Sequence, residues 1–271
     1  MRKASGVRVA SVGVLTGWGR GLAALPDDAR AAAAGRAVVP LARPALDGER
    51  FRRATRECLL GVEAVSATLA EGGLDRASIR GEGTALLFVT AAAYGASNVE
   101  FLGAAAGTLH FPYTAPSALP GEVAIEFGLT GAYVILIGGA PATVDALWQA
   151  GLLLAQGRCE RALVLAVETF MECEPLWRRA RWLAPPPLVE TAACALLVRG
   201  GDAPATYEAA AAAAPLEGTV ETRAGRTLAA APLVALALAR AAGESRARVT
   251  GSWRGRRAGI ALDLASQAVA V

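Results

Sequence analysis

Thiols and the imidazole are the first groups to consider for chemistry in this sequence, which has four cysteines and one histidine. Cys58, Cys159, Cys173 and Cys194 are widely spaced and form no C-x-x-C pair. Neither a zinc site nor a disulfide framework is therefore expected. Any Ser-His-Asp or Cys-His catalytic set would have to use His110, and an all-histidine metal site is excluded. Cys173, in a loop after an expected strand, is the best candidate for a reactive thiol, but buried structural roles are favoured for all four.

A glycine-rich segment follows the first expected strand and offers a second kind of chemistry. In VGVLTGWGRG (12–21), the glycines are Gly13, Gly17, Gly19 and Gly21. Such a loop superficially resembles a dinucleotide-binding turn, in which backbone N–H groups approach a pyrophosphate. The region after it lacks a second strand ending in an acidic residue, which ribose binding would need. A tight turn is favoured, and no cofactor is expected.

Composition narrows the class of protein. The 271 residues carry 27 basic and 24 acidic side chains, and no basic block with interleaved aromatic residues is present, so nucleic acid is not an expected partner. The chain is 54% hydrophobic, yet no uninterrupted apolar run reaches the roughly 20 residues of a membrane-spanning helix. No apolar run of signal-peptide length follows Arg2 and Lys3. A soluble cytoplasmic protein is expected.

Strand-like and helix-like segments alternate along the chain. Apolar segments predict strands at 7–16, 84–90, 132–138, 160–168, 191–199, 246–252 and 257–264. Helical spacing predicts helices at 51–73, 141–157 and 228–243. The central strands are continuously apolar rather than alternating, as a sheet covered on both faces requires. Because no clear linker is present, we expect one α/β domain, residues 1–271, with a mainly parallel sheet covered by helices on both faces.

Four consecutive segments resemble the N-terminal half of β-ketoacyl synthases, which have the thiolase-like fold. They are PSALPGEVAIEFGLTG (116–131), YVILI (133–137), GGAPATVDALWQAGLLLAQG (138–157) and RCERALVLAVE (158–168). Together with VRVASVGVLTGWG at the start and VETAACALLVRG (189–200), they extend the resemblance in order over about residues 7–200. The resemblance implies a truncated thiolase-like fold, in which residues 1–200 form the N-terminal half and residues 201–271 a shortened C-terminal part.

The sequence departs from the family at the nucleophile. The family places a cysteine at the start of a long buried helix, where the helix dipole and N–H groups lower its pKa. That position is Ala140 in IGGAPAT, and the family's two downstream histidines are absent because no histidine follows His110. No catalytic residue and no metal site are therefore expected, and the chain should not be a condensing enzyme on its own.

A family role without chemistry is the chain length factor of type II polyketide and aryl polyene systems. The resemblance implies a heterodimer with an active ketosynthase, whose acyl tunnel this chain would shape, and an acyl carrier protein as a further partner. Family members dimerise along the strand before the nucleophile turn, which makes Tyr133, Val134, Ile135, Leu136 and Ile137 the candidate interface. The preceding loop makes His110, Phe111 and Tyr113 candidates to line or plug the tunnel, with ordinary packing as the alternative.

Two other functions stay open. The chain could be an acyltransferase or thioesterase that uses another nucleophile, such as Cys173 or Ser117. It could also be a scaffold that binds carrier proteins, with Arg178, Arg179 and Arg181 facing an acidic carrier surface. A solvated basic face explains the same arginines without any partner.

Overall fold

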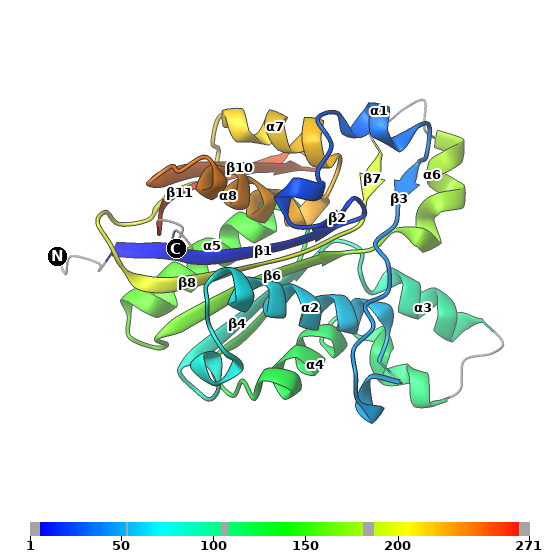
Figure 1. Ribbon diagram of the computed structural model, residues 1–271, viewed down its shortest axis with the longest axis horizontal. Coiled ribbons are helices and arrows are strands. Elements are labelled where there is room, and N and C mark those ends of the chain that lie inside the picture. Colours follow the sequence, from blue (N-terminus) through cyan, green and yellow to red (C-terminus); the bar gives the residue numbers. More distant parts are fainter. Residues whose placement is uncertain (1–5, 53, 104–107, 181–186, 266–271) are drawn as a thin grey trace.

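A nine-stranded sheet organises the molecule (Figure 1). The computed structural model describes residues 6–52, 54–103, 108–180 and 187–265. Its strands are β1 (Gly6–Thr16), β2 (Gly19–Arg20), β4 (Thr84–Thr90), β5 (Tyr133–Ile137), β6 (Arg161–Glu168), β8 (Thr191–Gly201), β9 (Thr206–Glu208), β10 (Arg246–Trp253) and β11 (Arg256–Leu264). The main path runs β10-β11-β1-β8-β6-β4-β5, and β2 and β9 pair with β1 and β11 beside it. A separate pair joins β3 (Val38–Val39) to β7 (Leu188–Val189).

The strand directions are mixed, which corrects the expectation of a mainly parallel sheet. The pairs β1–β11, β4–β6 and β4–β5 are parallel. The pairs β10–β11, β1–β8 and β6–β8 are antiparallel. β8 therefore opposes both of its neighbours. A continuously apolar strand indicates burial on both faces, which is true of any central strand in a covered sheet. It does not indicate whether the neighbouring strand is parallel or antiparallel.

Helices cover both faces of this sheet, as expected. They are α1 (Ala29–Ala33), α2 (Arg56–Glu71), α3 (Gly95–Leu102), α4 (Ala118–Phe127), α5 (Ala140–Ala155), α6 (Glu174–Ala180), α7 (Pro215–Ala224) and α8 (Ala231–Ala241). α2 and α4 pack on one face, and α5 and α8 on the other (Figure 1). Successive side chains of β4 enter different cores: Leu86 and Phe88 face α2 and α4, whereas Leu87 and Val89 face α5 and α8.

Short 3-10 helices occupy several connections between these elements. They are η1 (Leu22–Ala24), η2 (Glu49–Arg52), η3 (Arg76–Ile79), η4 (Thr108–Thr114), η5 (Met171–Cys173) and η6 (Leu228–Ala230). η4 lies between α3 and α4, and η6 leads directly into α8. None of the helices within the described ranges has both the length and the apolar character needed to cross a bilayer.

Local sequence explains the bounds of α2. The Thr55 hydroxyl caps its start by accepting a hydrogen bond from the Cys58 N–H at 3.4 Å. The helix ends at Glu71, Gly72 follows as its C-cap, and Gly73 then takes a positive φ of 63° that favours glycine. The glycine-rich segment after β1 is the tight turn that the sequence favours, because Thr16 pairs with Gly19 across it.

Candidate functional site

The turn between β5 and α5 places Ala140 at the first residue of a buried helix. Ala140 is 6% exposed, and Pro141 follows it in the first turn, where a proline needs no N–H partner. β10 packs closely against this turn. A β-carbon on Gly139 would lie 2.5 Å from Cγ of Trp253, and one on Gly251 would lie 2.5 Å from the Ala140 β-carbon. The backbone of β10 therefore approaches the turn as closely as glycine permits.

A buried carboxylate fixes the strand ends next to this turn. Glu168, at the end of β6, is fully buried and accepts hydrogen bonds from the N–H groups of Ala91, Ala92 and Ala229 at 2.8, 3.0 and 3.1 Å. The Thr90 hydroxyl donates a fourth at 3.3 Å. Complete burial raises the pKa of Glu168 to about 8, and these four donors oppose the shift.

The same bonding reaches the first turn of α5. Ala229, which donates to Glu168, also accepts a 2.6 Å hydrogen bond from the Thr143 hydroxyl at its carbonyl oxygen. Glu168 and Thr143 thus tie η6 to both β6 and α5. The sequence reasoning did not identify Glu168, although an acidic residue that ends a continuously apolar strand was a usable signal.

A cavity of about 540 Å³ opens beside Ala140. Its walls come from α7, from the Gly225–Leu228 segment before α8 and from residues 250–255 at the end of β10. None of the four cysteines lines it. The N-terminal end of α5 thus faces an open cavity in which the residue at the helix start carries a methyl group.

The cysteines are not activated for nucleophilic chemistry. Burial raises the pKa of the Cys58 thiol to about 11 and that of Cys194 to about 12. Burial also raises the pKa of Cys159, and burial together with the Glu172 carboxylate raises that of Cys173. All four thiols are therefore protonated at neutral pH. Cys173 is partly exposed on η5, as its loop position in the sequence suggests.

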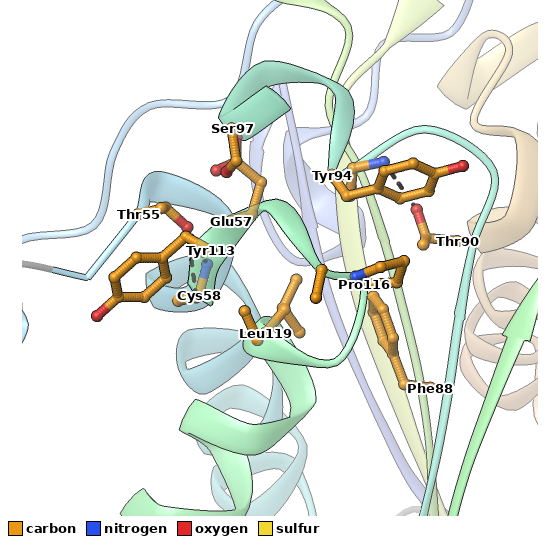
Figure 2. A pocket seen from close by; sticks show the side chains of 13 residues that line it. Thr55, Glu57, Cys58, Phe88, Thr90, Tyr94, Ser97, Tyr113, Pro116 and Leu119 are labelled. Carbon is orange, nitrogen blue, oxygen red and sulfur yellow. Dashed lines mark hydrogen bonds between the residues drawn. The ribbon is translucent and has the colours of Figure 1, made fainter. Parts of the chain in front are cut away.

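The two aromatic tunnel candidates have different surroundings. Phe111 is 62% exposed, and its ring centroid lies 5.7 Å from that of Phe101 on α3. Tyr113 packs against the core under α2 and lines a small pocket with Cys58 and Leu119 (Figure 2). That pocket has a volume of about 10 Å³, room for about one water molecule. His110 belongs to η4 with them.

The strand β5 forms the outer edge of the sheet, and among the described strands it pairs only with β4. The Ala132 carbonyl accepts from the Leu86 N–H at 2.8 Å, and the Gly138 N–H donates to Thr90 at 2.9 Å. Because the ladder direction alternates along a strand, the backbone groups of residues 133, 135 and 137 face outward. The side chains of Tyr133 and Ile137 are 42% and 50% exposed, whereas Val134, Ile135 and Leu136 pack partly against the core.

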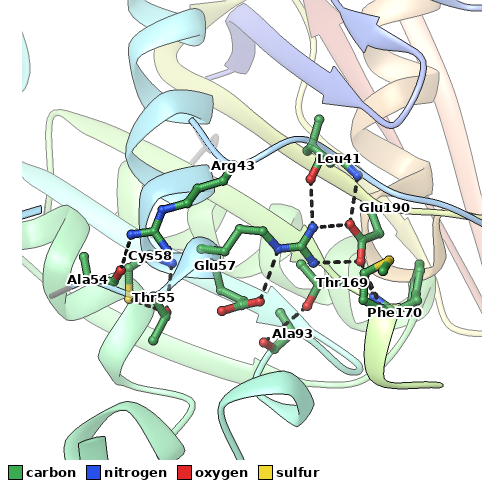
Figure 3. A network of polar contacts seen from close by, with 12 residues as sticks. Leu41, Arg43, Ala54, Thr55, Glu57, Cys58, Ala93, Thr169, Phe170 and Glu190 are labelled. Atoms are coloured by element: carbon green, nitrogen blue, oxygen red, sulfur yellow. Dashed lines mark hydrogen bonds and ion pairs between the residues drawn. The ribbon is translucent and has the colours of Figure 1, made fainter. Parts of the chain in front are cut away.

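A second polar network holds the segment after β6 (Figure 3). Glu190 is fully buried and receives both arms of the Arg56 guanidinium, at 2.6 and 2.8 Å. The N–H groups of Phe170 and Leu41 also donate to it, at 2.7 and 2.8 Å. This network is structural, because these four hydrogen bonds satisfy both Glu190 oxygens.

Glu172 lies beside this network without a partner. Both of its carboxylate oxygens are buried and have no hydrogen bond to a described residue. Burial and the nearby carboxylates of Glu57 and Glu190 raise the pKa of Glu172 to about 7, and Arg56 lowers it. Across the described ranges, no group of three or more His, Cys, Asp or Glu side chains could hold a metal ion.

The remaining sequence candidates are dispersed. Ser117 precedes α4, and its carbonyl accepts a 3.2 Å hydrogen bond from the Tyr133 hydroxyl. Arg178 and Arg179 are exposed on α6, and Arg181 lies outside the described residues. The structure therefore does not bring Ser117, Cys173 and the α6 arginines together into one site.

Comparison with known proteins agrees with this geometry. No curated protein matches the sequence. The fold is similar to the ishigamide ketosynthase/chain length factor, with a TM-score of 0.69 and 18% identity over 96% of this chain and 100% of that chain. It is also similar to AntDE:AntF, a type II PKS acyl-carrier protein in complex with its ketosynthase, with a TM-score of 0.68 and 12% identity over 96% and 99% of the two chains.

A third similar structure is 3-oxoacyl-(acyl carrier protein) synthase III, FabH, from Pseudomonas aeruginosa PAO1. Its TM-score is 0.56 at 18% identity, over 97% of this chain and 99% of that chain. These likenesses confirm the expected thiolase-like fold. The family model described as beta-ketoacyl synthase, N-terminal domain, matches residues 27–184, more than half of the 271 residues. The chain therefore belongs to the β-ketoacyl synthase family.

Proposed function

We propose that this protein is a non-catalytic ketosynthase-like subunit, a chain length factor. One observation carries the proposal: the helix start that presents a nucleophilic cysteine in active family members presents the methyl group of Ala140, 6% exposed, and no histidine follows His110. A methyl group cannot form a thioester. The thiols elsewhere in the chain have raised pKa values, which disfavours each of them as a replacement nucleophile and so supports the proposal.

The partner in this proposal is an active β-ketoacyl synthase, bound along β5. The edge strand offers outward N–H and C=O groups at residues 133, 135 and 137, and Tyr133 and Ile137 add exposed apolar surface. A partner strand that pairs here would continue the sheet across the heterodimer and cover the only side of β5 that lacks a neighbour among the described strands.

The chain would act on the product through shape. Phe111 is exposed on η4 next to Phe101, so it is the aromatic candidate that is free to enter a cavity of the partner. Tyr113 packs inward and would support the η4 backbone instead. A bulky side chain at the end of an acyl tunnel limits chain length by exclusion. The complex would receive acyl groups from an acyl carrier protein in polyketide, aryl polyene or fatty-acid-like biosynthesis.

In this proposal, residues 1–271 form one cytoplasmic domain. β10 and β11, from the C-terminal part, extend the same sheet beside β1, and α8 packs on that sheet next to α5. The C-terminal part therefore completes the sheet that positions α5 and β5.

Co-expression with the ketosynthase encoded nearest to this gene tests the proposal. The two chains should co-purify, and the pair should make a product of defined length from malonyl-loaded carrier protein. Phe111→Ala should shift products to longer chains, whereas Leu102→Ala, which removes an 84% exposed side chain from α3, should not. If the chains do not co-purify and the synthase alone makes the full-length product, the proposal is wrong.

Intact-mass analysis separates this function from the enzymatic alternative. The isolated chain, incubated with an acyl-loaded carrier protein, should gain no covalent acyl group. An adduct on Cys173 or Ser117 would instead indicate an acyltransferase or thioesterase. A chain that binds carrier protein and no synthase would indicate a scaffold.

A further inference from the structure

The carboxylate of Glu172, on η5, has no role in the proposed function. Glu168 and Glu190, which are fully buried, each accept at least four hydrogen bonds. Both oxygens of Glu172 are also hidden from solvent, but neither accepts a hydrogen bond from a residue that the structure describes. A buried carboxylate without donors costs much more free energy when it is charged than when it is protonated. The fold thus accommodates the neutral form of Glu172 better than its charged form.

The charges around Glu172 also disfavour its ionised form. Glu57 of α2 and Glu190, between β7 and β8, both repel a negative charge there (Figure 3). Arg56 attracts it, but this guanidinium is committed to Glu190, which it contacts at 2.6 and 2.8 Å, and to a backbone carbonyl at 2.8 Å. The neighbouring Cys173 adds no positive charge, because its thiol is protonated at neutral pH. With all three glutamates ionised, this cluster would hold three negative charges and one positive charge.

Glu172 lies directly against the first residue of α3. A β-carbon on Gly95 would lie 2.7 Å from Oε1 of Glu172, closer than real β-carbons approach another atom. The Gly95 N–H cannot serve as a donor, because it already bonds to the Ala92 carbonyl at 2.8 Å. A charged Glu172 therefore gains neither a donor nor water while η5 stays packed on α3.

The segment that carries Glu172 comprises η5 and α6 and is suited to local opening. None of its residues from 171 to 179 is buried as a whole, and Leu176 is 71% exposed. Trp177 anchors the segment by packing on a small apolar cluster and by its contact with Arg226, whose guanidinium lies 5.4 Å from the ring centroid. A segment with so little buried surface opens at a lower free-energy cost than the core does.

We propose that Glu172 is a proton-dependent latch that holds η5 and α6 against α3. When its carboxyl group is protonated, the segment packs on Gly95 as described. When the proton is lost to solvent, the segment detaches from α3, the carboxylate reaches water, and the sheet with its other helices stays folded. α3 also packs on η4, so the latch lies next to the segment that carries Phe111. The inference does not rest on the proposed function, because it concerns only contacts within this chain.

Opening is expected to increase as pH rises. Burial, together with the carboxylates of Glu57 and Glu190 and opposed by Arg56, raises the pKa of Glu172 to about 7 in the closed arrangement, against an ordinary value of 4.5. The closed arrangement thus binds the proton more tightly than the open one, in which the side chain is solvated. With these two values, the opening equilibrium increases about tenfold between pH 6 and pH 8.

Hydrogen–deuterium exchange of the whole isolated chain, followed by mass spectrometry at pH 6 and pH 8, tests the latch. Protection factors, corrected for the intrinsic pH dependence of exchange, report the opening equilibrium of each segment. From pH 6 to pH 8, peptides from residues 171–180 should lose about tenfold in protection. Amides of α8 should stay at least about 100-fold more protected than these peptides at both pH values, which would show that opening is local. Unchanged protection of residues 171–180, or protection equal to that of α8, would overturn the inference.

Two variants separate the effect of this carboxylate from that of its surroundings. Glu172→Gln has nearly the same shape and cannot ionise, so its residues 171–180 should have the same protection at pH 6 and pH 8. Glu174→Gln, on α6 in the same segment, is the matched control and should lose about tenfold as the parent does. A cooperative thermal melt confirms that each variant folds. The inference is overturned if the Glu172 variant loses protection as the parent does, or if the Glu174 variant abolishes the loss equally.

Discussion

The strand β5 and the start of the helix α5 are adjacent in sequence, but β5 lies at an exposed edge whereas the helix start is buried. Tyr133 and Ile137 are 42% and 50% exposed at an edge that pairs on one side, whereas Ala140, three residues beyond Ile137, is 6% exposed against β10. The proposed function uses both features: the open edge of β5 for association with a partner, and a helix start that carries no reactive group.

The two regions also differ in how they are held. The turn rests on segments that Glu168 joins through four hydrogen bonds, while β5 is held by β4 and by partial packing of its central side chains. Changes under the turn should therefore act on stability, and changes at the edge should act on association.

The largest effect is expected at the edge. Ile137→Pro removes an outward N–H and leaves the ladder to β4 intact, because residue 138 and not residue 137 bonds to β4. Association with the ketosynthase should weaken about 100-fold, close to 3 kcal/mol, with little change in the melting temperature of the isolated chain. Ile137→Val is the matched control. Equal affinities for the two variants, measured by interferometry, would show that partners do not pair along β5.

Glu168→Gln should have the largest effect on stability. An amide NH₂ would face backbone N–H groups that now donate to a carboxylate, leaving at least one buried donor unsatisfied. The loss should be about 2–3 kcal/mol in urea unfolding at about pH 9, above the Glu168 pKa of about 8, where this side chain is a carboxylate. Glu49→Gln, in an exposed ion pair with Arg52, should cost less than about 1 kcal/mol. A Glu168 variant as stable as this control would mean that the carboxylate does not hold the segments together.

Ala140→Cys restores a thiol to the helix start and should not restore condensation, because no histidine follows His110. The added sulfur enters a turn already in close contact with β10, so a loss of about 1 kcal/mol is expected in urea unfolding. Ala140→Ser is the control for size. The isolated variant, supplied with acyl- and malonyl-loaded carrier protein, should release no condensed product in mass spectrometry. Any turnover would contradict the proposal that the site is inactive beyond its missing thiol.

The smallest effect is the pH dependence of Glu172. Its pKa is about 7 in the folded chain against an ordinary value of 4.5, so the folded state holds the proton more tightly than the unfolded state does. The parent protein therefore loses stability as pH rises from about 4.5 to about 7. Glu172→Gln removes this loss. The variant should match the parent at pH 4 and exceed it by about 1 kcal/mol at pH 8, a value reduced because the side chain is partly solvated.

Urea unfolding of both proteins at pH 4, 5.5 and 8 measures this difference. Glu57, Glu190 and Arg56 are present in both proteins, so their own titration largely cancels in the comparison. A stability difference that does not change with pH would mean that Glu172 keeps an ordinary pKa.

The sequence by itself was enough to predict what depends on neighbours along the chain. Continuous apolar runs gave the buried strands β4, β6 and β8, helical spacing gave α2 and α5, and the motif order placed Ala140 at a helix start. These features depend on the local composition and periodicity of a segment, which a reader of the sequence sees directly.

Only the tertiary structure decided what depends on contacts between distant segments. The antiparallel placement of β8 between β1 and β6, the four donors gathered at Glu168 and the cavity beside Ala140 each join segments far apart in the chain. The different surroundings of Phe111 and Tyr113 have the same origin. An aromatic side chain can lie on the surface or against the core, and only the contacts between segments decide which. The apolar composition of a single segment is enough to predict its burial. A strand's pairing partner, a shared hydrogen-bond acceptor or a cavity wall forms only when several segments have come together.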